Sequence, residues 1–366
     1  MRKVLTVVGT RPNFIKVSQF RKEFGKHKDT FELRMVHTGQ HYDRKMSDVF
    51  FEQLKFDEME YALNIAPTTP AKQMGEMMIK LDDLYADWKP DLVMVVGDVN
   101  STLAAALSAN KNNIKVAHVE SGLRSFDRTM PEEHNRVLTD FITDIFFVTE
   151  ASGKENLLKE GKSADQIFAV GNTMIDTLVA FENELDQSPV LSDLKLTNHP
   201  YVLMTLHRPS NVDEPSQLSK LFDLVEHLTK TYSVVFPIHP RTRNNIKRFG
   251  LEERLNAIER WILTEPLDYF AFQKLIKHAK FILTDSGGIQ EETTFRQIPC
   301  LTLRENTERP VTVDIGTNVL IPFDLTIINS LVKQIEDGTY KKGRIPEMWD
   351  GKATHRIVET LVRVLA

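Results

Sequence analysis

Carboxylates follow two of the short apolar runs in the first half of the sequence. Asp98 comes just after one run, Glu120 comes directly after the next, and Glu132 and Glu133 stand a little further along. Carboxylates that gather in a crevice can have raised pKa values and can serve as general acids or bases. Structural roles are open as well, because Asp98 can cap the following helix and acids in a first helical turn favour its dipole.

Cations and a glycine turn could hold an anionic ligand. Arg11 and Lys16 are five residues apart after the first apolar run, and both could attract a diphosphate if they face one crevice. Ser286–Gly288 stands before a predicted helix, where two glycines allow a phosphate close to the backbone and the helix N-terminus offers unpaired N–H groups. Glu292, one turn later, could reach a ribose hydroxyl. Alternatively, Arg11 and Lys16 are surface cations, Ser286–Gly288 is an ordinary tight turn, and Glu292 lies on a solvated helix face.

Two histidines also follow apolar runs. His207, which Arg208 follows, and His239 can each transfer protons or be hydrogen-bonded structural groups. Neither of these two histidines is part of a His-x-x-x-His spacing that would suggest a metal, and the single cysteine, Cys300, can form neither an internal disulfide nor a thiolate metal site. The patterns Gly-x-x-x-x-Gly-Lys and Gly-x-Gly-x-x-Gly are absent from the sequence, which disfavours P-loop and dinucleotide sites.

The elements that must position these residues follow from the apolar pattern. Short apolar runs alternate with longer amphipathic segments along the whole chain, which predicts an α/β fold with parallel sheets. Ligands of such sheets bind beyond the carboxyl ends of the strands, where the candidate residues fall. The predicted strands are Val4–Val8, Leu33–His37, Leu92–Val96, Val116–Val119, Ile145–Val148, Ile167–Val170, Tyr201–Leu206, Val234–Ile238, Trp261–Leu263, Phe281–Thr284 and Cys300–Leu303.

Two domains are expected. The pattern lapses into a polar stretch between Asn183 and Pro200, which we interpret as the interdomain linker. This interpretation gives an N-terminal Rossmann-like domain over residues 1–185 and a C-terminal one over residues 200–350. A final helix within residues 351–366, about Ala353–Leu365, can pack on either domain.

Composition narrows the function classes. The chain has 366 residues with a net charge of −5, which argues against a nucleic-acid-binding protein. No apolar run approaches the roughly 20 residues of a membrane span, and the N-terminus lacks a secretion signal, so we expect a cytoplasmic protein. Only 16 glycines occur, and seven of them follow predicted strands, where the backbone must turn or approach a ligand: Gly9, Gly39, Gly97, Gly122, Gly171, Gly287 and Gly288.

The strings at the strand ends resemble those of one enzyme family. Over about residues 1–325 the chain is similar to non-hydrolysing UDP-N-acetylglucosamine 2-epimerases, and the combination of motifs is highly specific. The strings that carry the resemblance are Gly9-Thr10-Arg11-Pro12, Val36-His37-Thr38-Gly39-Gln40-His41, Gly97-Asp98, His118-Val119-Glu120, Gly122-Leu123-Arg124-Ser125, Pro131-Glu132-Glu133, Asn135-Arg136, Gly171-Asn172-Thr173, His207-Arg208, Thr284-Asp285-Ser286-Gly287-Gly288-Ile289-Gln290-Glu291-Glu292 and Thr307-Glu308-Arg309-Pro310.

The resemblance implies an architecture and a reaction. It implies two Rossmann-like domains facing across a cleft, as in glycosyltransferase-B enzymes, and a homodimer. The substrate is a UDP-sugar and no redox cofactor is needed. The reaction interconverts UDP-N-acetylglucosamine and UDP-N-acetylmannosamine by loss and readdition of UDP through 2-acetamidoglucal, so proton-handling groups are needed near both faces of the sugar.

The same resemblance assigns roles to residues. The family's catalytic set corresponds to Asp98, Glu120, Glu132 and His207. The substrate-binding positions correspond to Arg11, Lys16, Gln40, His41, Arg136, Arg208, His239, Ser286, Gly287, Gly288, Glu292 and Arg309, with Ser286 and Gly288 on phosphate and Glu292 on ribose.

Departures from the family pattern leave the sugar open. The string His207-Arg208-Pro209-Ser210-Asn211 replaces the common His-Arg-Arg-Glu-Asn, and Arg124–Met130 resembles relatives that epimerise UDP-diacetamido-uronates. A modified UDP-sugar such as UDP-2,3-diacetamido-glucuronate is therefore an alternative substrate. Two further functions stay open, namely a hydrolysing epimerase that releases UDP, and a UDP-sugar-binding module or glycosyltransferase without epimerase activity.

Overall fold

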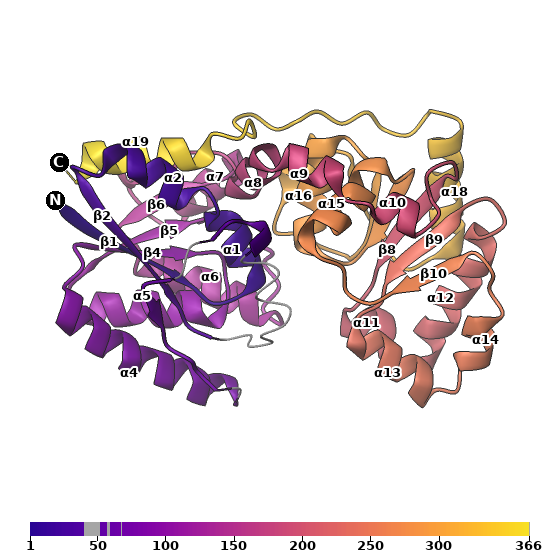
Figure 1. Cartoon of the computed structure of the whole chain (residues 1–366), viewed down its shortest axis with the longest axis horizontal. Helices are drawn as coiled ribbons and strands as arrows, with labels where there is room; N and C mark the ends of the chain where they lie inside the picture. Colours follow the sequence, from indigo (N-terminus) through magenta and orange to yellow (C-terminus); the bar gives the residue numbers. More distant parts are fainter. Residues whose placement is uncertain (40–51, 57–58, 67, 366) are drawn as a thin grey trace. The chain divides into compact units, whose positions relative to one another are not determined.

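The computed structural model describes residues 1–39, 52–56, 59–66 and 68–365. It divides into two compact units, one formed by Met1–Phe181 with Glu347–Ala366 and the other by Glu182–Pro346 (Figure 1). We call them unit 1 and unit 2 and describe each by itself.

Unit 1 is built on a parallel sheet with the strand order β3-β2-β1-β4-β5-β6-β7. Its central strands consist almost wholly of buried apolar residues, as expected for a sheet covered on both faces. The strands are β1 (Arg2–Val8), β2 (Phe31–His37), β3 (Tyr61–Ala62), β4 (Leu92–Val96), β5 (Lys115–Val119), β6 (Ile145–Val148) and β7 (Ile167–Ala169).

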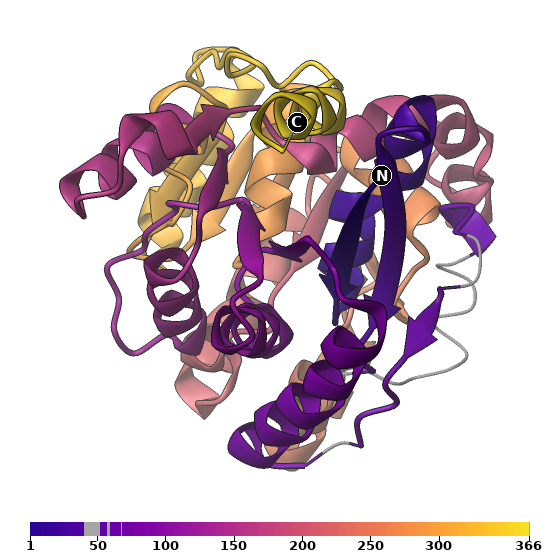
Figure 2. The same cartoon turned by 90° about the vertical axis from the view of Figure 1, so that its left-hand side faces the viewer.

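Helices connect these strands, and proline begins some of them because the first helical turn needs no backbone N–H partner. Among the described residues, the α-helices of unit 1 are α1 (Arg11–Val17), α2 (Phe20–Phe24), α4 (Pro70–Trp88), α5 (Asn100–Lys111), α6 (Pro131–Phe141), α7 (Ala151–Lys159), α8 (Thr173–Ala180) and α19 (Ala353–Val364). Figure 2 shows both chain ends on this unit, and the Nε of Arg2 donates to the carbonyl of Leu365 over 3.0 Å.

Unit 2 contains a second parallel sheet with the order β10-β9-β8-β11-β12-β13. Val202 and Met204 point into one apolar cluster while Tyr201 and Leu203 point into another, so both faces of the sheet are packed. The strands are β8 (Tyr201–Thr205), β9 (Ser233–Pro237), β10 (Trp261–Thr264), β11 (Phe281–Thr284), β12 (Cys300–Leu303) and β13 (Asn318–Ile321).

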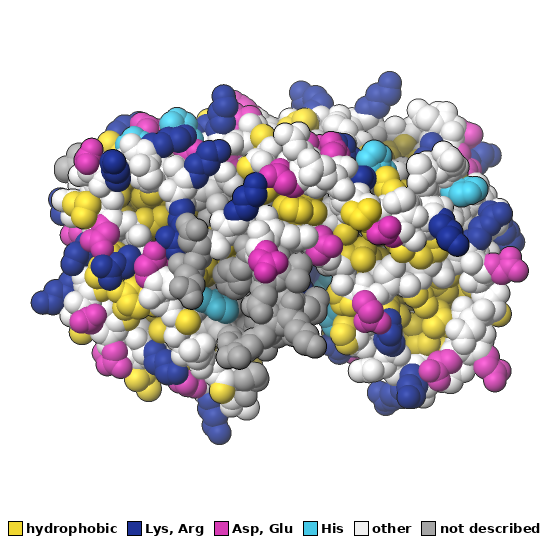
Figure 3. Space-filling model, in the orientation of Figure 1, with side chains coloured by type: hydrophobic (Ala, Val, Ile, Leu, Met, Phe, Trp, Pro, Cys, Tyr) yellow, Lys and Arg dark blue, Asp and Glu magenta, His cyan; other side chains and the backbone are white. Residues whose placement is uncertain are grey.

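Ten helices of the described chain belong to unit 2. They are α9 (Glu182–Gln187), α10 (Val190–Asp193), α11 (Pro209–Val212), α12 (Pro215–Leu228), α13 (Pro240–Arg248), α14 (Glu252–Asn256), α15 (Tyr269–His278), α16 (Gly287–Arg296), α17 (Pro310–Asp314) and α18 (Leu325–Glu336). Acidic and basic side chains are interspersed over both units on the face seen in Figure 3.

The α/β class with two parallel sheets is confirmed, and each predicted strand corresponds to an observed one within two residues at either end. Strands β3 and β13 were not predicted. β3 has only two residues, and β13 has a polar first residue, Asn318, so neither stands out as an apolar run. No described helix is long and apolar enough to cross a membrane.

The polar stretch after Asn183 differs from a linker. It forms α9 and α10, whose buried residues include Leu185 and Val190, and Lys277 on α15 pairs with Glu182 over 2.7 Å. Because these short helices consist mostly of polar residues, the sequence pattern does not reveal the few apolar side chains that pack them against unit 2.

The C-terminal helix α19 belongs to unit 1. Ile357 and Leu361 are fully buried, and the carboxylate of Asp176 accepts the N–H groups of Ala353 and Thr354 over 2.9 and 2.6 Å. This carboxylate supplies the acceptor that the N–H groups of the first helical turn lack within the helix.

Candidate functional site

Asp98 and Glu120 follow neighbouring strands of unit 1. Strands β4 and β5 pair in parallel with Val96 opposite Val119, so both acids stand at the same edge of the sheet. The Gly97 backbone between them is left-handed, with a φ of 67°, and a Cβ there would lie 3.1 Å from the Lys16 Nζ. The structure thus brings Asp98, Glu120 and Lys16 together, as the strand-end argument predicts.

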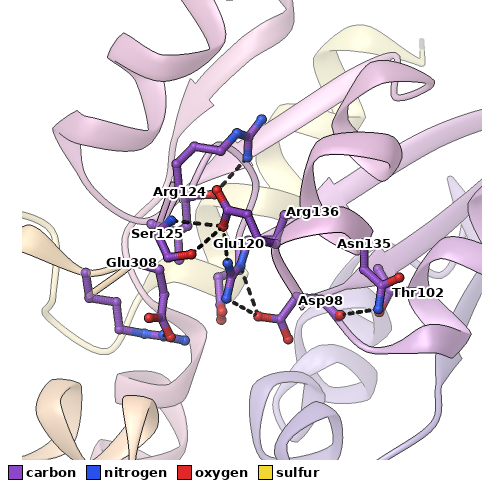
Figure 4. A network of polar contacts seen from close by, with 12 residues as sticks. Asp98, Thr102, Glu120, Arg124, Ser125, Asn135, Arg136 and Glu308 are labelled. Carbon is purple, nitrogen blue, oxygen red and sulfur yellow. Dashed lines mark hydrogen bonds and ion pairs between the residues drawn. The ribbon is translucent and has the colours of Figure 1, made fainter. Parts of the chain in front are cut away.

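Arg136 on α6 holds the Asp98 carboxylate. Its Nε and one terminal nitrogen donate to Asp98 Oδ2 over 3.0 and 2.8 Å (Figure 4). Its other terminal nitrogen donates to Glu133 Oε2 over 2.6 Å. Arg136 is 2 % exposed, so its guanidinium group is shielded from water. The side chain of Asn135 donates to the Asp98 carbonyl over 2.9 Å and fixes the same turn from the backbone.

Glu133 is a clamp for the loop after β5. Its carboxylate accepts the Ser125 N–H and hydroxyl over 2.9 Å each and the Phe126 N–H over 2.9 Å. Glu132, the candidate from the motif, is exposed on the first turn of α6. The two neighbouring acids therefore have different surroundings, and a catalytic role for Glu132 stays a prediction.

Glu120 forms a buried pair with Lys16. The Lys16 Nζ lies 2.6 Å from Glu120 Oε2, and the two side chains are 5 % and 3 % exposed. Glu120 also has a φ of 70°, a conformation that costs a non-glycine residue about 1–3 kcal/mol. A strained, buried carboxylate with a cationic partner is typical of a functional position.

Asn13 ties the first turn of unit 1 together and was not a candidate from the sequence. Its Oδ1 accepts the N–H groups of Gly9 and Thr10 over 3.1 Å each, and its Nδ2 donates to the Val96 carbonyl over 3.0 Å. It thereby links the turn that carries Arg11 to the end of β4. No strand-end signal marks Asn13, because it lies inside α1. Arg11 itself is half-buried at the start of that helix.

A second polar network lies behind the Glu120 turn. Asp140 Oδ1 faces the His118 Nδ1 at 2.6 Å, and Oδ2 accepts from Gly122 N and from an Arg124 terminal nitrogen over 3.0 and 2.7 Å. Burial alone would raise the pKa of Asp140, but His118 and Arg124 lower it below its usual value. Arg124 also pairs with Glu160 at 2.7 Å, so this first residue of the Arg124–Met130 run serves the fold of unit 1.

His207 in unit 2 is bound to a buried carboxylate. The Nδ1 of His207 lies 2.9 Å from Asp285 Oδ1, and the His207 side chain is 44 % exposed while Asp285 is fully buried. Asp285 belongs to one of the family strings but was not a candidate from the sequence. It directly follows β11, the same signal that marks Asp98 as a candidate.

His239 lies beside His207. The two ring centroids are 5.6 Å apart, and the His239 Nδ1 accepts the Arg241 N–H over 3.1 Å. Burial, then the charges of His207 and Arg241, lower the pKa of His239 below its usual value. Arg208, half-buried, precedes the short helix α11, and its N–H donates to Asp285.

The glycine turn of unit 2 rests on a cluster of buried charges. A Cβ on Gly287 would lie 2.7 Å from Glu308 Oε1 and 3.0 Å from an Arg309 terminal nitrogen, so no side chain fits there without displacing the cluster. Arg309 Nε lies 2.8 Å from Glu291 Oε2, and Arg304 donates to Glu308 over 3.0 Å. Ser286, Gly287 and Gly288 at the start of α16 are partly exposed, so the turn is accessible above this cluster.

Glu292 of unit 2 has a raised pKa. It is 5 % exposed, and burial raises its pKa to about 8, against the opposing effects of Gln273 and Arg296. A carboxyl group in this state can donate a hydrogen bond at neutral pH as well as accept one.

Two predicted substrate-binding residues, Gln40 and His41, lie outside the described residues. Among the described residues no group of three or more His, Cys, Asp or Glu side chains is arranged to hold a metal ion.

Known proteins share these features of sequence and fold. The sequence pattern of the UDP-N-acetylglucosamine 2-epimerase family matches residues 23–362. The chain is 40 % identical to a UDP-N-acetylglucosamine 2-epimerase of Methanocaldococcus jannaschii, with 98 % of both chains covered. It is 37 % identical to a UDP-2,3-diacetamido-2,3-dideoxy-D-glucuronate 2-epimerase of Pseudomonas aeruginosa, with 99 % of this chain and 100 % of that protein covered.

A solved structure agrees with this. The crystal structure of the Methanocaldococcus jannaschii enzyme in complex with UDP-GlcNAc and UDP superposes with a TM-score of 0.87 at 39 % identity, covering 99 % of both chains.

Proposed function

We propose that this chain, which belongs to the UDP-N-acetylglucosamine 2-epimerase family, interconverts UDP-N-acetylglucosamine and UDP-N-acetylmannosamine. The observation that carries the proposal within the structure is the placement of Asp98 and Glu120 at adjacent strand ends, each against a buried cation. The epimerase reaction needs carboxylates that can move a proton at C2, and this edge of the sheet provides two of them.

The chemistry follows from the substrate. The hydrogen at C2 is not next to a carbonyl, so simple enolisation is unavailable. Loss of UDP from C1, which leaves with the C1–O electron pair, and removal of the C2 proton together form the C1=C2 bond of 2-acetamidoglucal. Readdition of UDP at C1 with protonation of C2 from the opposite face gives the epimer, so each direction conserves protons and electrons.

Proton transfer at C2 is assigned to side chains of both units. Asp98 and Glu120 of unit 1 are candidate acid–base groups, with Glu132 as a further candidate, and His207 of unit 2 is the remaining one. Arg136 and Lys16 have carboxylate partners within unit 1, so the cation that each contributes is already oriented. Contact of either cation with the diphosphate stays a prediction.

Binding of UDP is assigned mainly to unit 2. The turn Ser286–Gly288 at the start of α16 offers backbone N–H groups and the positive end of a helix dipole to the β-phosphate, which carries the charge that develops as C1–O breaks. Arg309 adds a cation beneath the turn, and Glu292, one helical turn later, is the residue that we assign to the ribose. Arg11, Arg208, His239, Gln40 and His41 complete the predicted set.

Proton exchange at C2 in D2O tests this proposal. Purified protein with UDP-N-acetylglucosamine should incorporate one deuterium at C2 of both epimers, followed by NMR. Absence of exchange with any UDP-sugar would refute the epimerase assignment. Accumulation of free UDP in step with turnover would instead show a hydrolysing epimerase.

A second substrate is favoured by one observation. The Pseudomonas aeruginosa relative named for UDP-2,3-diacetamido-2,3-dideoxy-D-glucuronate is 37 % identical over nearly the whole chain. The same exchange assay with that sugar decides between the two UDP-sugars, because the better substrate is the one with the higher kcat/KM.

The expected homodimer and cytoplasmic location stay predictions. Light scattering of the purified protein tests whether it is a homodimer.

A further inference from the structure

We propose that Asp285 is a positioning residue for His207, holding the imidazole by Nδ1 so that Nε2 is the nitrogen that exchanges a proton with the substrate. The inference rests on the proposed function and adds a residue and an atom to it. It concerns unit 2 alone.

The Asp285 carboxylate presents only acceptor atoms to His207. It accepts the His207 N–H over 3.0 Å, the Arg208 N–H over 2.8 Å and the Asn211 side-chain amide over 3.0 Å, in addition to facing the His207 Nδ1 at 2.9 Å. The two backbone N–H groups always donate, so a hydrogen on Oδ2 would lie against the Arg208 N–H. These donors and the lowered pKa of Asp285 keep the carboxylate ionised, so the His207 Nδ1 carries the hydrogen of their contact.

The electrostatics of the pocket agree with this. Burial alone would raise the pKa of Asp285, yet the hydrogen bond and charge of His207, followed by Arg208 and Asn211, lower it below its usual value. Asp285 is fully buried, so the contact is shielded from water.

The position of the hydrogen on Nδ1 fixes the role of the other ring nitrogen. In the neutral ring Nε2 then has a free lone pair, and in the charged ring it has a proton to give. Because 44 % of the His207 side chain is exposed, a ligand can reach this ring. An aspartate that sets the tautomer of a catalytic histidine is a recurring device in proton transfer.

Other charged groups face the pair from neighbouring elements. His239 after β9 has its ring centroid 5.6 Å from that of His207, and its Nδ1 accepts the Arg241 N–H, which leaves its hydrogen on Nε2. Its lowered pKa keeps this neighbouring ring neutral. Arg208 follows His207 in the chain, and Arg304 lies near enough to Arg208 to interact with its charge. Arg304 is itself paired with Glu308 over 3.0 Å, and Asp285 is the carboxylate in contact with the His207 ring.

A purely structural role is the competing explanation, because Asp285 also anchors the turn between β8 and α11. A double-mutant cycle separates the two roles. Asp285→Asn and His207→Ala are made singly and together, with Asp324→Asn as the matched control, since Asp324 accepts two backbone N–H groups at the start of α18 without a histidine partner.

The positioning role predicts a specific pattern. Asp285→Asn should lower kcat about 10²-fold, the size expected for loss of general acid–base catalysis. It should change the pH profile of kcat and leave the Kd for UDP, measured by calorimetry, within threefold. On the His207→Ala background the same change should have less than a threefold effect on kcat, and Asp324→Asn should leave kcat unchanged. An undiminished loss of kcat on the His207→Ala background would overturn the inference.

A measurement on the unmodified protein guards against misfolding of the variant. In ¹⁵N NMR spectra of the histidine-labelled chain, neutral His207 should carry its hydrogen on Nδ1. Observation of the Nε2–H tautomer would overturn the inference even if Asp285→Asn fails to fold. This readout needs no turnover, whereas failure of the proposed function appears as absence of C2 exchange in the unmodified protein, so the two failures are distinguishable.

Discussion

Glu292 should make unit 2 less stable as the pH rises through the neutral range. Its pKa is about 8 in the folded chain against an ordinary value of 4.5, because the side chain is buried. Below pH 4.5 the carboxyl group is protonated in both the folded and the unfolded chain, so its burial does not change the free energy of unfolding with pH. As the pH rises from 4.5 towards 8, its burial lowers the free energy of unfolding progressively. At pH 7 the unfolded chain has lost this proton and the folded chain retains it. Because pH 7 lies 2.5 units above the ordinary pKa of 4.5, and each unit corresponds to about 1.36 kcal/mol, the free energy of unfolding is lowered by about 3 kcal/mol.

Glu292→Gln removes this titration while keeping the shape of the side chain. The variant should unfold with a free energy about 3 kcal/mol higher than the unmodified chain at pH 7, and the difference should vanish near pH 4.5. Hydrogen exchange of the α15 and α16 amides across pH 4.5 to 8, corrected for intrinsic rates, measures this difference within unit 2. The exposed Glu253→Gln on α14 is the control and should have no such pH dependence. A stability difference that is equal at all pH values would refute the reasoning.

Individual contacts give three further predictions. Asp98→Asn should abolish epimerisation while calorimetry still detects UDP binding, and joint loss of binding and turnover would count against a catalytic role. Gly287→Ala should weaken UDP binding at least tenfold, because its Cβ would lie 2.7 Å from Glu308 Oε1, and an unchanged Kd would contradict the close packing of the turn. Arg124→Met should destabilise unit 1 by about 3–5 kcal/mol in urea unfolding, because it leaves the buried Asp140 without its arginine partner, and a loss below 1 kcal/mol would show that the pair is dispensable.

The edges of the sheets could be predicted from the sequence because they depend on local pattern. Apolar runs mark buried parallel strands, and the residue after each run lies at the ligand-binding edge whatever the details of packing. Asp98, Glu120 and His207 were all found in this way. Lys16 was found by its distance from the first strand, and its partner Glu120 comes from an element about one hundred residues away.

The partners of these residues could not be predicted in the same way. Arg136 was expected at the UDP, and the structure shows its contacts with Asp98 and Glu133, which depend on the angle at which α6 packs on the sheet. Asn13 and Asp140 lie inside helices, where sequence alone does not show which polar side chain turns inward. Asp285 directly follows a predicted strand, as the other candidates do, but the glycine turn beside it, Ser286–Gly288, already accounted for that part of the motif.

The proposed reaction breaks and re-forms the C1–O bond of the UDP-sugar during epimerisation. Positional isotope exchange detects this step, with UDP-N-acetylglucosamine that carries ¹⁸O in the bridge between C1 and the β-phosphorus. If UDP leaves and returns, its β-phosphate can rotate in between, and ³¹P NMR should show ¹⁸O moving from the bridging to the non-bridging positions as the epimer forms. Epimerisation at C2 with the ¹⁸O retained wholly in the bridge would show that the C1–O bond stays intact and would refute the elimination of UDP.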